Sequence, residues 1–276
     1  MITLIKRAIV FVLCTIFQTA LPLFFFSFVA LLAVGFFIDV TMLYVFVTWG
    51  VISVVWVVLS LLSVMFTPIV IRFYGGRRLL ESERELLLPA IEEVAQEVDY
   101  LKGIYLSVID ENMEANAFVI GHYMVFHSAL IQSTSADELR GVIAHEYAHM
   151  KYRDSYFSSV RSTLQIPMIF LIKILDSIVG FCKGFPPLMI IGLPFLLVLL
   201  PLQLITFLIN LIVLSISRYE EYRADWFSAT HGFKDGLMSF LHKMSQRETK
   251  KSWIEGVLDT HPSSPKRILK LESVFN

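Results

Sequence analysis

The segment His145-Glu146-Tyr-Ala-His149 places two imidazoles and a carboxylate within five residues. If it is helical, residues four apart project from the same face, so His145 and His149 can bind one metal ion together. Glu146 lies beside them and is suited to take a proton from a water molecule that attacks a carbonyl carbon. The pattern suggests a zinc hydrolase. A match this short arises by chance in about one chain in a hundred. Other residues must therefore decide whether the motif belongs to a metal site.

A catalytic zinc ion usually has three protein ligands, and the motif supplies two. Glu221 and Asp225 are four apart, so on a helix Glu221 can bind the metal while Asp225 accepts a hydrogen bond from the other ring nitrogen of a histidine ligand. Glu221 and Asp225 could also be part of the charged end of an apolar helix that leaves a membrane. The presence of the His-Glu-x-x-His motif favours a metal site instead. The remaining candidates are Asp154, Glu220, His122, His127, His231, His242 and His261.

The composition indicates a membrane protein. Of the 276 residues, 56% are hydrophobic and only 17% are charged, which is too apolar for an ordinary soluble domain. The net charge of −1 gives no electrostatic reason to expect nucleic acid as a partner. Both cysteines, Cys14 and Cys182, lie in or beside apolar runs, so any metal must use His, Asp or Glu.

Four apolar runs are long enough to cross a hydrocarbon core of about 30 Å: residues 8–38, 42–71, 164–181 and 185–216. The third contains Lys173, and a lone lysine at a helix centre costs about 2.5 to 3.5 kcal/mol on insertion. Asp176 is three residues away and can offset it. We therefore expect the two to form a structural pair that faces other helices.

Charged residues at the ends of the runs predict the topology. Lys6 and Arg7 precede the first run and Arg72 follows the second, whereas the turn between the runs has no Lys or Arg. The positive-inside rule then places both outer ends in the cytoplasm, and the basic ends suit a bacterial inner membrane.

A metal ion held by both His149 and Glu221 requires an even number of membrane crossings between these residues. Either the last two runs are two spans, or the third run lies flat and the fourth is a re-entrant hairpin broken at Pro194 or Pro201. We expect two spans, with both termini and the site in the cytoplasm.

The polar segments predict an α+β domain. Residues 79–101 have the pattern of an amphipathic helix, which Pro89 could kink. Residues 104–109, 117–120 and 123–126 are short strand-like pieces that predict a small antiparallel sheet. Ser135 and Glu138 form a capping box, so the helix with His145 should begin at Ser135. The tail predicts a turn followed by a short helix.

The expected architecture is a mostly α membrane protein with about four transmembrane helices and one cytoplasmic α+β metalloprotease domain. Its segments are residues 1–73 (an N-terminal transmembrane hairpin), 74–160 (the first part of the domain), 161–216 (a second hairpin) and 217–276 (the second part, with the third ligand).

The chain resembles the integral-membrane zinc metalloproteases of the HtpX family, which are relatives of the CAAX prenyl proteases. A prenyl protease would need more spans. The motifs that carry the resemblance are His145-Glu146-Tyr-Ala-His149 followed by Asp154, Ser217-Arg218-x-x-Glu221-Tyr-x-Ala-Asp225, Asn116-Ala-Phe118, and His261-Pro262 with Arg267-Ile268.

The resemblance implies a gluzincin-type protease with one Zn²⁺ per chain, bound by His145, His149 and Glu221. Glu146 would be the catalytic base and Asp225 would support the ligands. The strand next to Asn116 would line the substrate cleft, where an extended peptide could add to the sheet edge. Arg218 and His261 match family positions with a supporting or substrate-binding role. A second electrophile could be Tyr219, His231 or His261.

The family also implies polypeptide substrates, namely damaged or misassembled membrane proteins, and a role in quality control under stress. Two alternatives stay open: a narrow-specificity processing protease of lipidated or signal-like peptides, and a non-enzymatic membrane scaffold with a structural zinc. Glu146 argues against the scaffold, because a structural zinc site has no role for this additional carboxylate.

Overall fold

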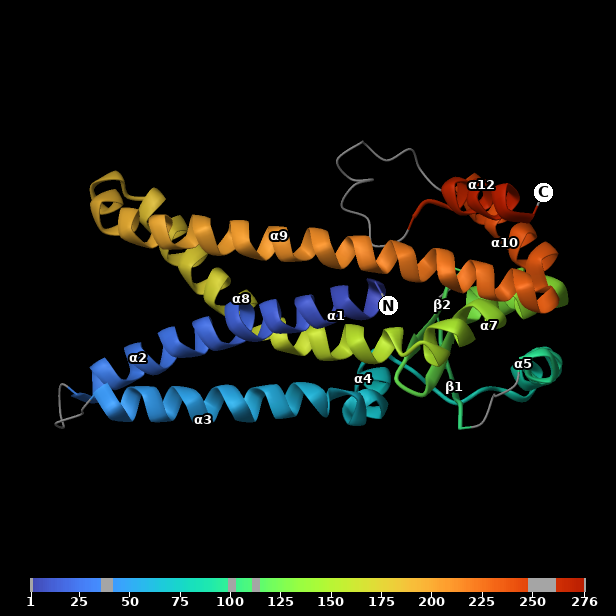
Figure 1. Cartoon of the computed structure of the whole chain (residues 1–276), viewed down its shortest axis with the longest axis horizontal. Helices are drawn as coiled ribbons and strands as arrows, with labels where there is room; N and C mark the ends of the chain where they lie inside the picture. The colour runs from blue at the N-terminus through green and yellow to red at the C-terminus, as the bar shows by residue number, and fades with distance from the viewer. Residues whose placement is uncertain (1, 36–41, 99–102, 111–114, 248–261, 276) are drawn as a thin grey trace. The chain divides into compact units, whose positions relative to one another are not determined.

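The computed structural model describes residues 2–35, 42–98, 103–110, 115–247 and 262–275. The chain divides into two compact units, each built from two segments. The first unit comprises Met1–Ser63 and Ser159–Val213, and the second comprises Val64–Ser158 and Leu214–Asn276. The first unit contains the apolar helices and the second contains the sheet and the polar helices (Figure 1).

In the described part of the chain, four helical stretches are long and apolar enough to cross a membrane, which confirms the expected number. They are Leu4–Ala30, Leu43–Leu61, Asp154–Lys183 and Pro186–Gln246. The helices that make them up are α1 (Ile2–Leu13), the π-helical η1 (Cys14–Ala20), α2 (Leu21–Gly35), α3 (Met42–Leu61), α8 (Asp154–Lys183), η3 (Pro186–Leu188), α9 (Met189–Ser228), η4 (Ala229–Phe233) and α10 (Lys234–Arg247).

One detail of the apolar runs differs from expectation. The second run is not one helix, because a 3₁₀ turn, η2 (Ser63–Phe66), separates α3 from the short helix α4 (Thr67–Phe73). Proline in the first turn of α4 fits this break, since it cannot donate the hydrogen bond that a continuous helix would need there. In contrast, α9 continues through Pro194 and Pro201, so the re-entrant alternative is not what forms.

Within the first unit, α8 and α9 pack through a buried apolar cluster that includes Leu171, Leu175 and Leu199. The expected pairing of Lys173 with Asp176 is wrong in the described part of the chain. Both side chains are exposed, and neither has an ion pair.

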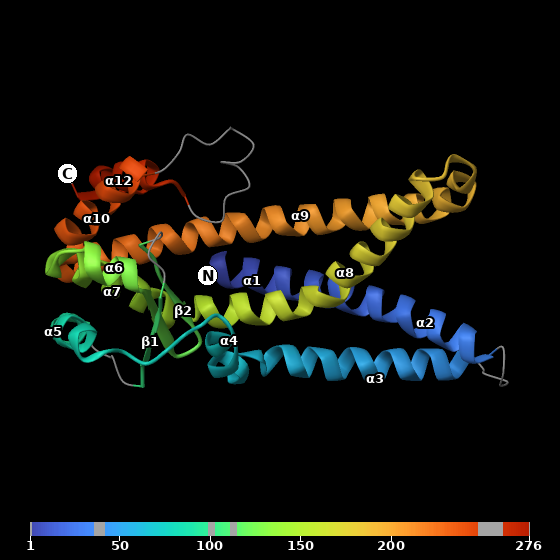
Figure 2. The ribbon, with the colours of Figure 1, turned by 180° about the vertical axis from the view of Figure 1, so that it is seen from behind.

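The second unit contains a three-stranded sheet with the order β1-β3-β2. The strands are β1 (Tyr105–Ile109), β2 (Ala117–Ile120) and β3 (Tyr123–His127). β2 and β3 are antiparallel, but β1 and β3 are parallel, so the expected purely antiparallel sheet is wrong in this detail. The reason is that β3, not β2, is the neighbour of β1, so β1 and β2 do not form a hairpin. β2 is consequently an edge strand (Figure 2).

Helices surround this sheet and bury its core. α5 (Glu81–Glu97) contributes Leu87, β3 contributes Phe126, α7 (Ala136–Lys151) contributes Ile143, and the end of α9 contributes Phe227. Among its described residues, the unit also contains α4, α10, α6 (Ser128–Ser133) and α12 (Ser264–Phe275). The predicted tail helix thus forms, whereas the turn before it falls mainly on residues outside the described ranges.

Helix α7 begins where the capping box predicted. Ser135 Oγ accepts a hydrogen bond from the Glu138 amide at 3.3 Å, and the Ser135 amide donates to Glu138 Oε2 at 2.9 Å. Two otherwise unpaired amides at the start of the helix are therefore satisfied.

Two glycines allow α10 to lie directly against α7. A Cβ on Gly141 would come within 2.4 Å of the Leu237 amide nitrogen, and one on Gly236 within 2.0 Å of the Asp137 carbonyl oxygen. The chain turns from α9 into α10 at Gly232, whose φ of +90° favours glycine. The backbone contact between α7 and α10 therefore depends on the lack of side chains at Gly141 and Gly236.

Candidate metal centre

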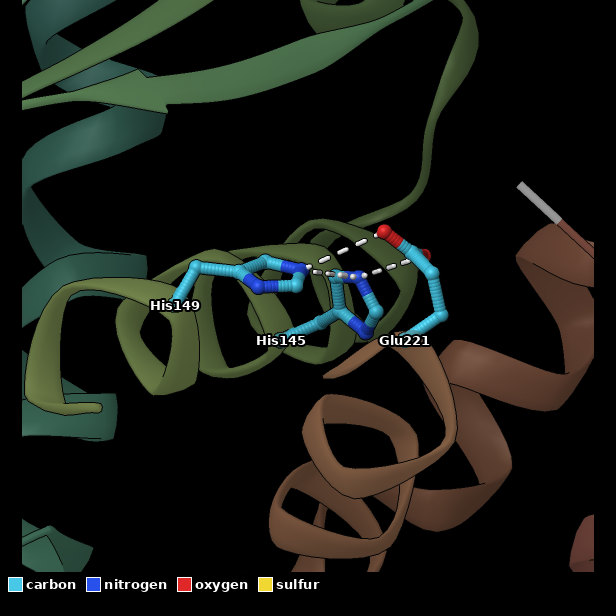
Figure 3. Close-up of side chains that lie close together, drawn as sticks. All are labelled: His145, His149 and Glu221. Carbon is cyan, nitrogen blue, oxygen red and sulfur yellow. Dashed lines mark hydrogen bonds and ion pairs between the residues drawn. The ribbon is translucent and has the colours of Figure 1, made fainter. Parts of the chain in front are cut away.

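Two nitrogen atoms and one carboxylate converge between α7 and α9. The Nε2 atoms of His145 and His149 are 3.2 Å apart, and each lies 3.5 Å from one oxygen of Glu221. Among the described residues, these three form a group that could hold a metal ion, because one nitrogen or oxygen atom of each lies within 4.8 Å of the others (Figure 3). The close-up shows the two rings on adjacent turns of α7 and Glu221 approaching from the opposite helix.

These separations fit a tetrahedral metal ion. Zinc binds imidazole nitrogen and carboxylate oxygen at about 2.0–2.2 Å, so two ligand atoms of a tetrahedron lie roughly 3.3–3.5 Å apart. The observed distances of 3.2 and 3.5 Å lie at or close to that range. The donor set of two histidines and one glutamate is also one that catalytic zinc uses.

The other ring nitrogen of each histidine faces an aspartate. His145 Nδ1 lies 2.9 Å from Asp225 Oδ1, and His149 Nδ1 lies 2.9 Å from Asp154 Oδ2. A carboxylate at Nδ1 keeps the proton on that nitrogen, which leaves the lone pair of Nε2 directed at the shared point. Both imidazoles are thus oriented by the same arrangement.

Arg267 of α12 contacts three members of this cluster. Its Nε and Nη2 atoms donate to the two oxygens of Asp225 at 2.8 and 2.5 Å. Its Nη1 atom lies 3.4 Å from Glu221, and Nη2 lies 3.3 Å from His145 Nδ1. Burial acts to lower the pKa of Arg267, but the negative charge of Asp225 and its hydrogen bonds have the larger effect. The pKa of Arg267 is therefore raised above its ordinary value. The guanidinium stays charged and balances two buried carboxylates.

Asp154 has a matching arginine. Arg223 donates to Asp154 Oδ1 at 2.5 Å and stacks on Tyr152, with Cζ 4.0 Å from the ring centroid. Arg153 adopts a left-handed φ of 58° in the turn between α7 and α8. This turn places Asp154 so that its side chain reaches His149. This turn could not be recognised from the residue types.

Glu146 is buried next to His145 on α7, and burial is the main cause that raises its pKa. The negative charge of Glu221 also raises this pKa, whereas His145 and His149 act to lower it. A carboxylate with a raised pKa is suited to accept a proton and release it again near neutral pH.

Burial and the charge of Arg267 act to lower the pKa of His145. Hydrogen bonds to Asp225 and Glu221 outweigh both and raise it to about 9. The metal-free centre therefore takes up a proton at neutral pH, and that proton must leave when a metal ion binds.

Buried contacts hold α7 in register with α9 and α10. Ser228 Oγ, at the end of α9, donates to the Gly141 carbonyl at 3.0 Å. From α10, Lys243 and Ser239 both donate to the Glu138 carboxylate at 2.6 Å. The two histidines and Glu221 are thus held together by contacts outside the cluster.

The other residues singled out in the sequence have different places. Asn116 is exposed just before β2, and its carbonyl accepts the His127 amide at 2.9 Å. Arg218 is partly buried on α9, and His261 lies outside the described residues. His231 Nδ1 lies 2.8 Å from the Phe227 carbonyl oxygen, so this nitrogen forms a hydrogen bond at the end of α9.

A cavity of about 390 Å³ adjoins the centre, because Asp225 and Arg267 form part of its wall. Tyr219, a candidate electrophile, faces this cavity and is 53% exposed. Its lining residues are Tyr219, Tyr222, Arg223, Asp225, Trp226, Arg267, Lys270, Leu271 and Val274.

The fold and the centre together define a class: membrane-length helices joined to a domain in which a His-Glu-x-x-His helix faces a glutamate, as in membrane metalloproteases. Residues 82–274 match the family described as peptidase family M48, and the chain belongs to that family. The resemblance to HtpX proteases is thereby confirmed.

Similar proteins include a "Protease HtpX homolog" of Sulfurihydrogenibium sp. (strain YO3AOP1), 31% identical over 168 residues, which are 57% of this chain and 54% of the relative. Another, of Aquifex aeolicus, is 26% identical over 239 residues, 74% of this chain and 76% of the relative. The alignment thus spans about half the length of the first relative. The crystal structure of S. mikatae Ste24p shares the fold, with a TM-score of 0.54 and 21% identity, over 89% of this chain and 61% of Ste24p.

Proposed function

We propose that this protein is a zinc-dependent endopeptidase that cleaves damaged or misassembled membrane proteins at the cytoplasmic membrane surface. The observation that carries the proposal is the convergence of His145 Nε2, His149 Nε2 and the Glu221 carboxylate, with Glu146 buried beside them. Membership of peptidase family M48 supports the reaction class.

In this proposal His145, His149 and Glu221 bind the zinc ion, and Asp225 and Asp154 orient the imidazoles. When bound, zinc would supply a Lewis acid that polarises the scissile carbonyl and activates water. Glu146 removes the proton from the attacking water and passes it to the leaving amine. Its raised pKa supports both transfers.

The edge strand β2 supports an endopeptidase. β2 packs against α7, and its outer edge has no neighbouring strand among the described residues. An extended substrate segment can add to this edge and present successive peptide bonds to the helix that carries Glu146. Asn116, exposed at the start of β2, is then placed to contact the substrate.

The first test separates the base from the ligands. We expect Glu146→Gln in the purified full chain to keep one equivalent of zinc while cleavage falls about 10²- to 10⁴-fold. Glu221→Ala should lose zinc, whereas Glu220→Ala at the neighbouring position should retain it. Unchanged cleavage by Glu146→Gln would refute the base assignment. Intact zinc affinity in Glu221→Ala would refute the ligand set.

The substrate class is tested with a panel of unfolded membrane proteins against single lipidated or signal-like peptides. The proposal expects several unrelated members of the panel to be cleaved. Cleavage confined to one peptide type would favour a processing protease instead.

A further inference from the structure

The membrane-length helix α8 carries two opposite charges on its exposed face. Lys173 and Asp176 are both exposed, and within the described part of the chain neither side chain has an ion pair or hydrogen bond. Ser177, on the same face, is also exposed and donates its hydroxyl to the Lys173 carbonyl at 2.7 Å. The charges are one helical turn apart, yet they do not pair with each other.

This face points away from the helix packing of its own unit. Leu171, Leu175 and Val179 are buried on the opposite side of α8, where the cluster includes Leu199 and Leu202 of α9. At 3.6 residues per turn, Lys173, Asp176, Ser177 and Gly180 fall together on the other side. We call these four residues the polar face.

Lipid is a poor environment for the polar face. Lys173 lies about 15 Å before the end of α8 at Lys183, given a rise of 1.5 Å per residue, which is farther than a lysine side chain extends. In a span over residues 164–181, Lys173 lies near the middle, about 12 Å or more from either end, so its side chain does not reach the headgroups. Charged residues inside a span normally pair with other protein groups or line a protein interior.

We propose that the polar face binds the polar face of a second copy of this chain. Two copies inserted with the same topology are related by a two-fold axis along the membrane normal, so their α8 helices run parallel. Lys173 of each copy then meets Asp176 of the partner subunit across an axial offset of about 4.5 Å, which the flexible lysine spans. The symmetry forms two identical ion pairs and removes four charges from lipid.

The rest of the face permits close contact. A Cβ added to Gly180 would meet no atom within 4 Å, and Ser177 is also small, so a second helix can approach the backbone of α8. A second copy fits better than an unrelated helix, because it always presents both charges at the required spacing.

Cross-linking of the full chain in vesicles at low protein density tests the contact. Ser177→Cys should give a disulfide-linked dimer on mild oxidation. Val54→Cys, exposed on α3, is the matched control, and the chain without an added cysteine is the second, since Cys14 and Cys182 are buried. Cross-linking of Ser177→Cys no stronger than that of Val54→Cys overturns the proposal.

Charge variants in the Ser177→Cys background test the ion pairs. Lys173→Asp and Asp176→Lys each create a polar face with charges of one sign only. Each should reduce the amount of cross-linked dimer about tenfold. Co-expression of the two, with different tags, should restore a cross-linked heterodimer, because their faces are complementary. Failure to restore it contradicts the pairing.

A neutral variant keeps the test independent of insertion defects. Lys173→Met with Asp176→Asn removes the charges and so eases insertion of α8. We still expect about a tenfold loss of dimer. Undiminished cross-linking in this variant overturns the proposal.

Discussion

At the scale of single residues, the centre repeats one unit: a histidine, an aspartate at its Nδ1 atom and an arginine on that aspartate. His145 has Asp225 and Arg267, while His149 has Asp154 and Arg223. The arginines allow the aspartates to remain ionised although both are buried. Each imidazole is therefore held in one orientation before any metal ion arrives.

We expect Asp154→Asn and Asp225→Asn each to weaken metal binding by about 10- to 100-fold, because an amide orients the imidazole less firmly and makes it a weaker ligand. Competition with a chromogenic chelator measures the affinity. Asp110→Asn, an exposed aspartate paired with Arg77, is the control and should bind metal like the wild type. Equal affinities for all three variants would contradict the orienting role.

The sequence predicted the three residues that converge, His145, His149 and Glu221, but not all of the side chains that contact them. Two histidines at one-turn spacing and Glu221 four residues before Asp225 are local patterns, so periodicity was enough to propose them. Arg267 lies in a distant helix, and nothing local to it indicates that its guanidinium reaches Asp225 and Glu221. Asp154 was a candidate ligand, and only the backbone turn at Arg153 makes it a partner of His149 Nδ1.

At the scale of elements, α7 is fixed by its cap and by direct backbone contact with α10. Gly141→Ala would place a methyl group within 2.4 Å of the Leu237 backbone nitrogen. We expect a loss of about 1–3 kcal/mol of stability and a displaced ligand helix, with lower metal content. Thermal unfolding and metal analysis of the purified chain measure both.

The matched control is Gly50→Ala in α3, where a Cβ meets no atom within 4 Å. Alanine favours helix more than glycine, so this variant should be neutral or slightly more stable. A loss of stability as large in Gly50→Ala as in Gly141→Ala would show that the close approach of α7 and α10 is unimportant.

The Glu138 carboxylate joins α7 to α10 and makes this junction sensitive to acid. Burial acts to raise the pKa of Glu138, but hydrogen bonds from Lys243, Ser239 and the Ser135 amide outweigh it and lower this pKa. A carboxyl group with a lowered pKa in the folded state stabilises the fold above its unfolded pKa of about 4.3, and this stability is lost as the pH falls through the folded value.

Glu138→Gln should therefore be less stable than the wild type at neutral pH, and the difference should shrink as the pH falls below about 4.3. Thermal unfolding from pH 7 to pH 3 measures it. Glu92→Gln, an exposed position on α5, should follow the wild type throughout. A difference between Glu138→Gln and the wild type that widens in acid would contradict the linkage.

The sequence predicted elements where the determining signals are local. The capping box fixed the start of α7, and apolar length fixed the four membrane helices. Strand pairing was not predictable in the same way, because the order β1-β3-β2 depends on which strands become neighbours after the chain has folded. The break between α3 and α4 lies inside a continuous apolar run, so hydrophobicity alone did not reveal it.

At the scale of the whole molecule, the centre links two distant parts of the chain. His145 and His149 come from the first segment of the second unit and Glu221 from its second segment. A metal ion that binds all three therefore stabilises the folded unit, since the unfolded chain does not hold them together.

We expect removal of metal with a chelator to lower the midpoint of thermal unfolding, and added zinc to restore it. With free metal at 100 times its Kd, binding contributes about 2.7 kcal/mol. Glu221→Ala should show the same midpoint with and without metal, and a chelator already saturated with zinc should leave the wild type unchanged. Equal midpoints for metal-free and metal-loaded wild type would refute the link.

The position of Glu221 near the end of α9, the last membrane-length helix, also sets when the proposed centre can assemble. Translation proceeds at about 5–20 residues per second, so Glu221 is synthesised several seconds after His149. During that interval a half-inserted chain has two imidazoles and a base but lacks its third ligand. In the proposed mechanism, proteolysis therefore begins only once the chain has been made through Glu221.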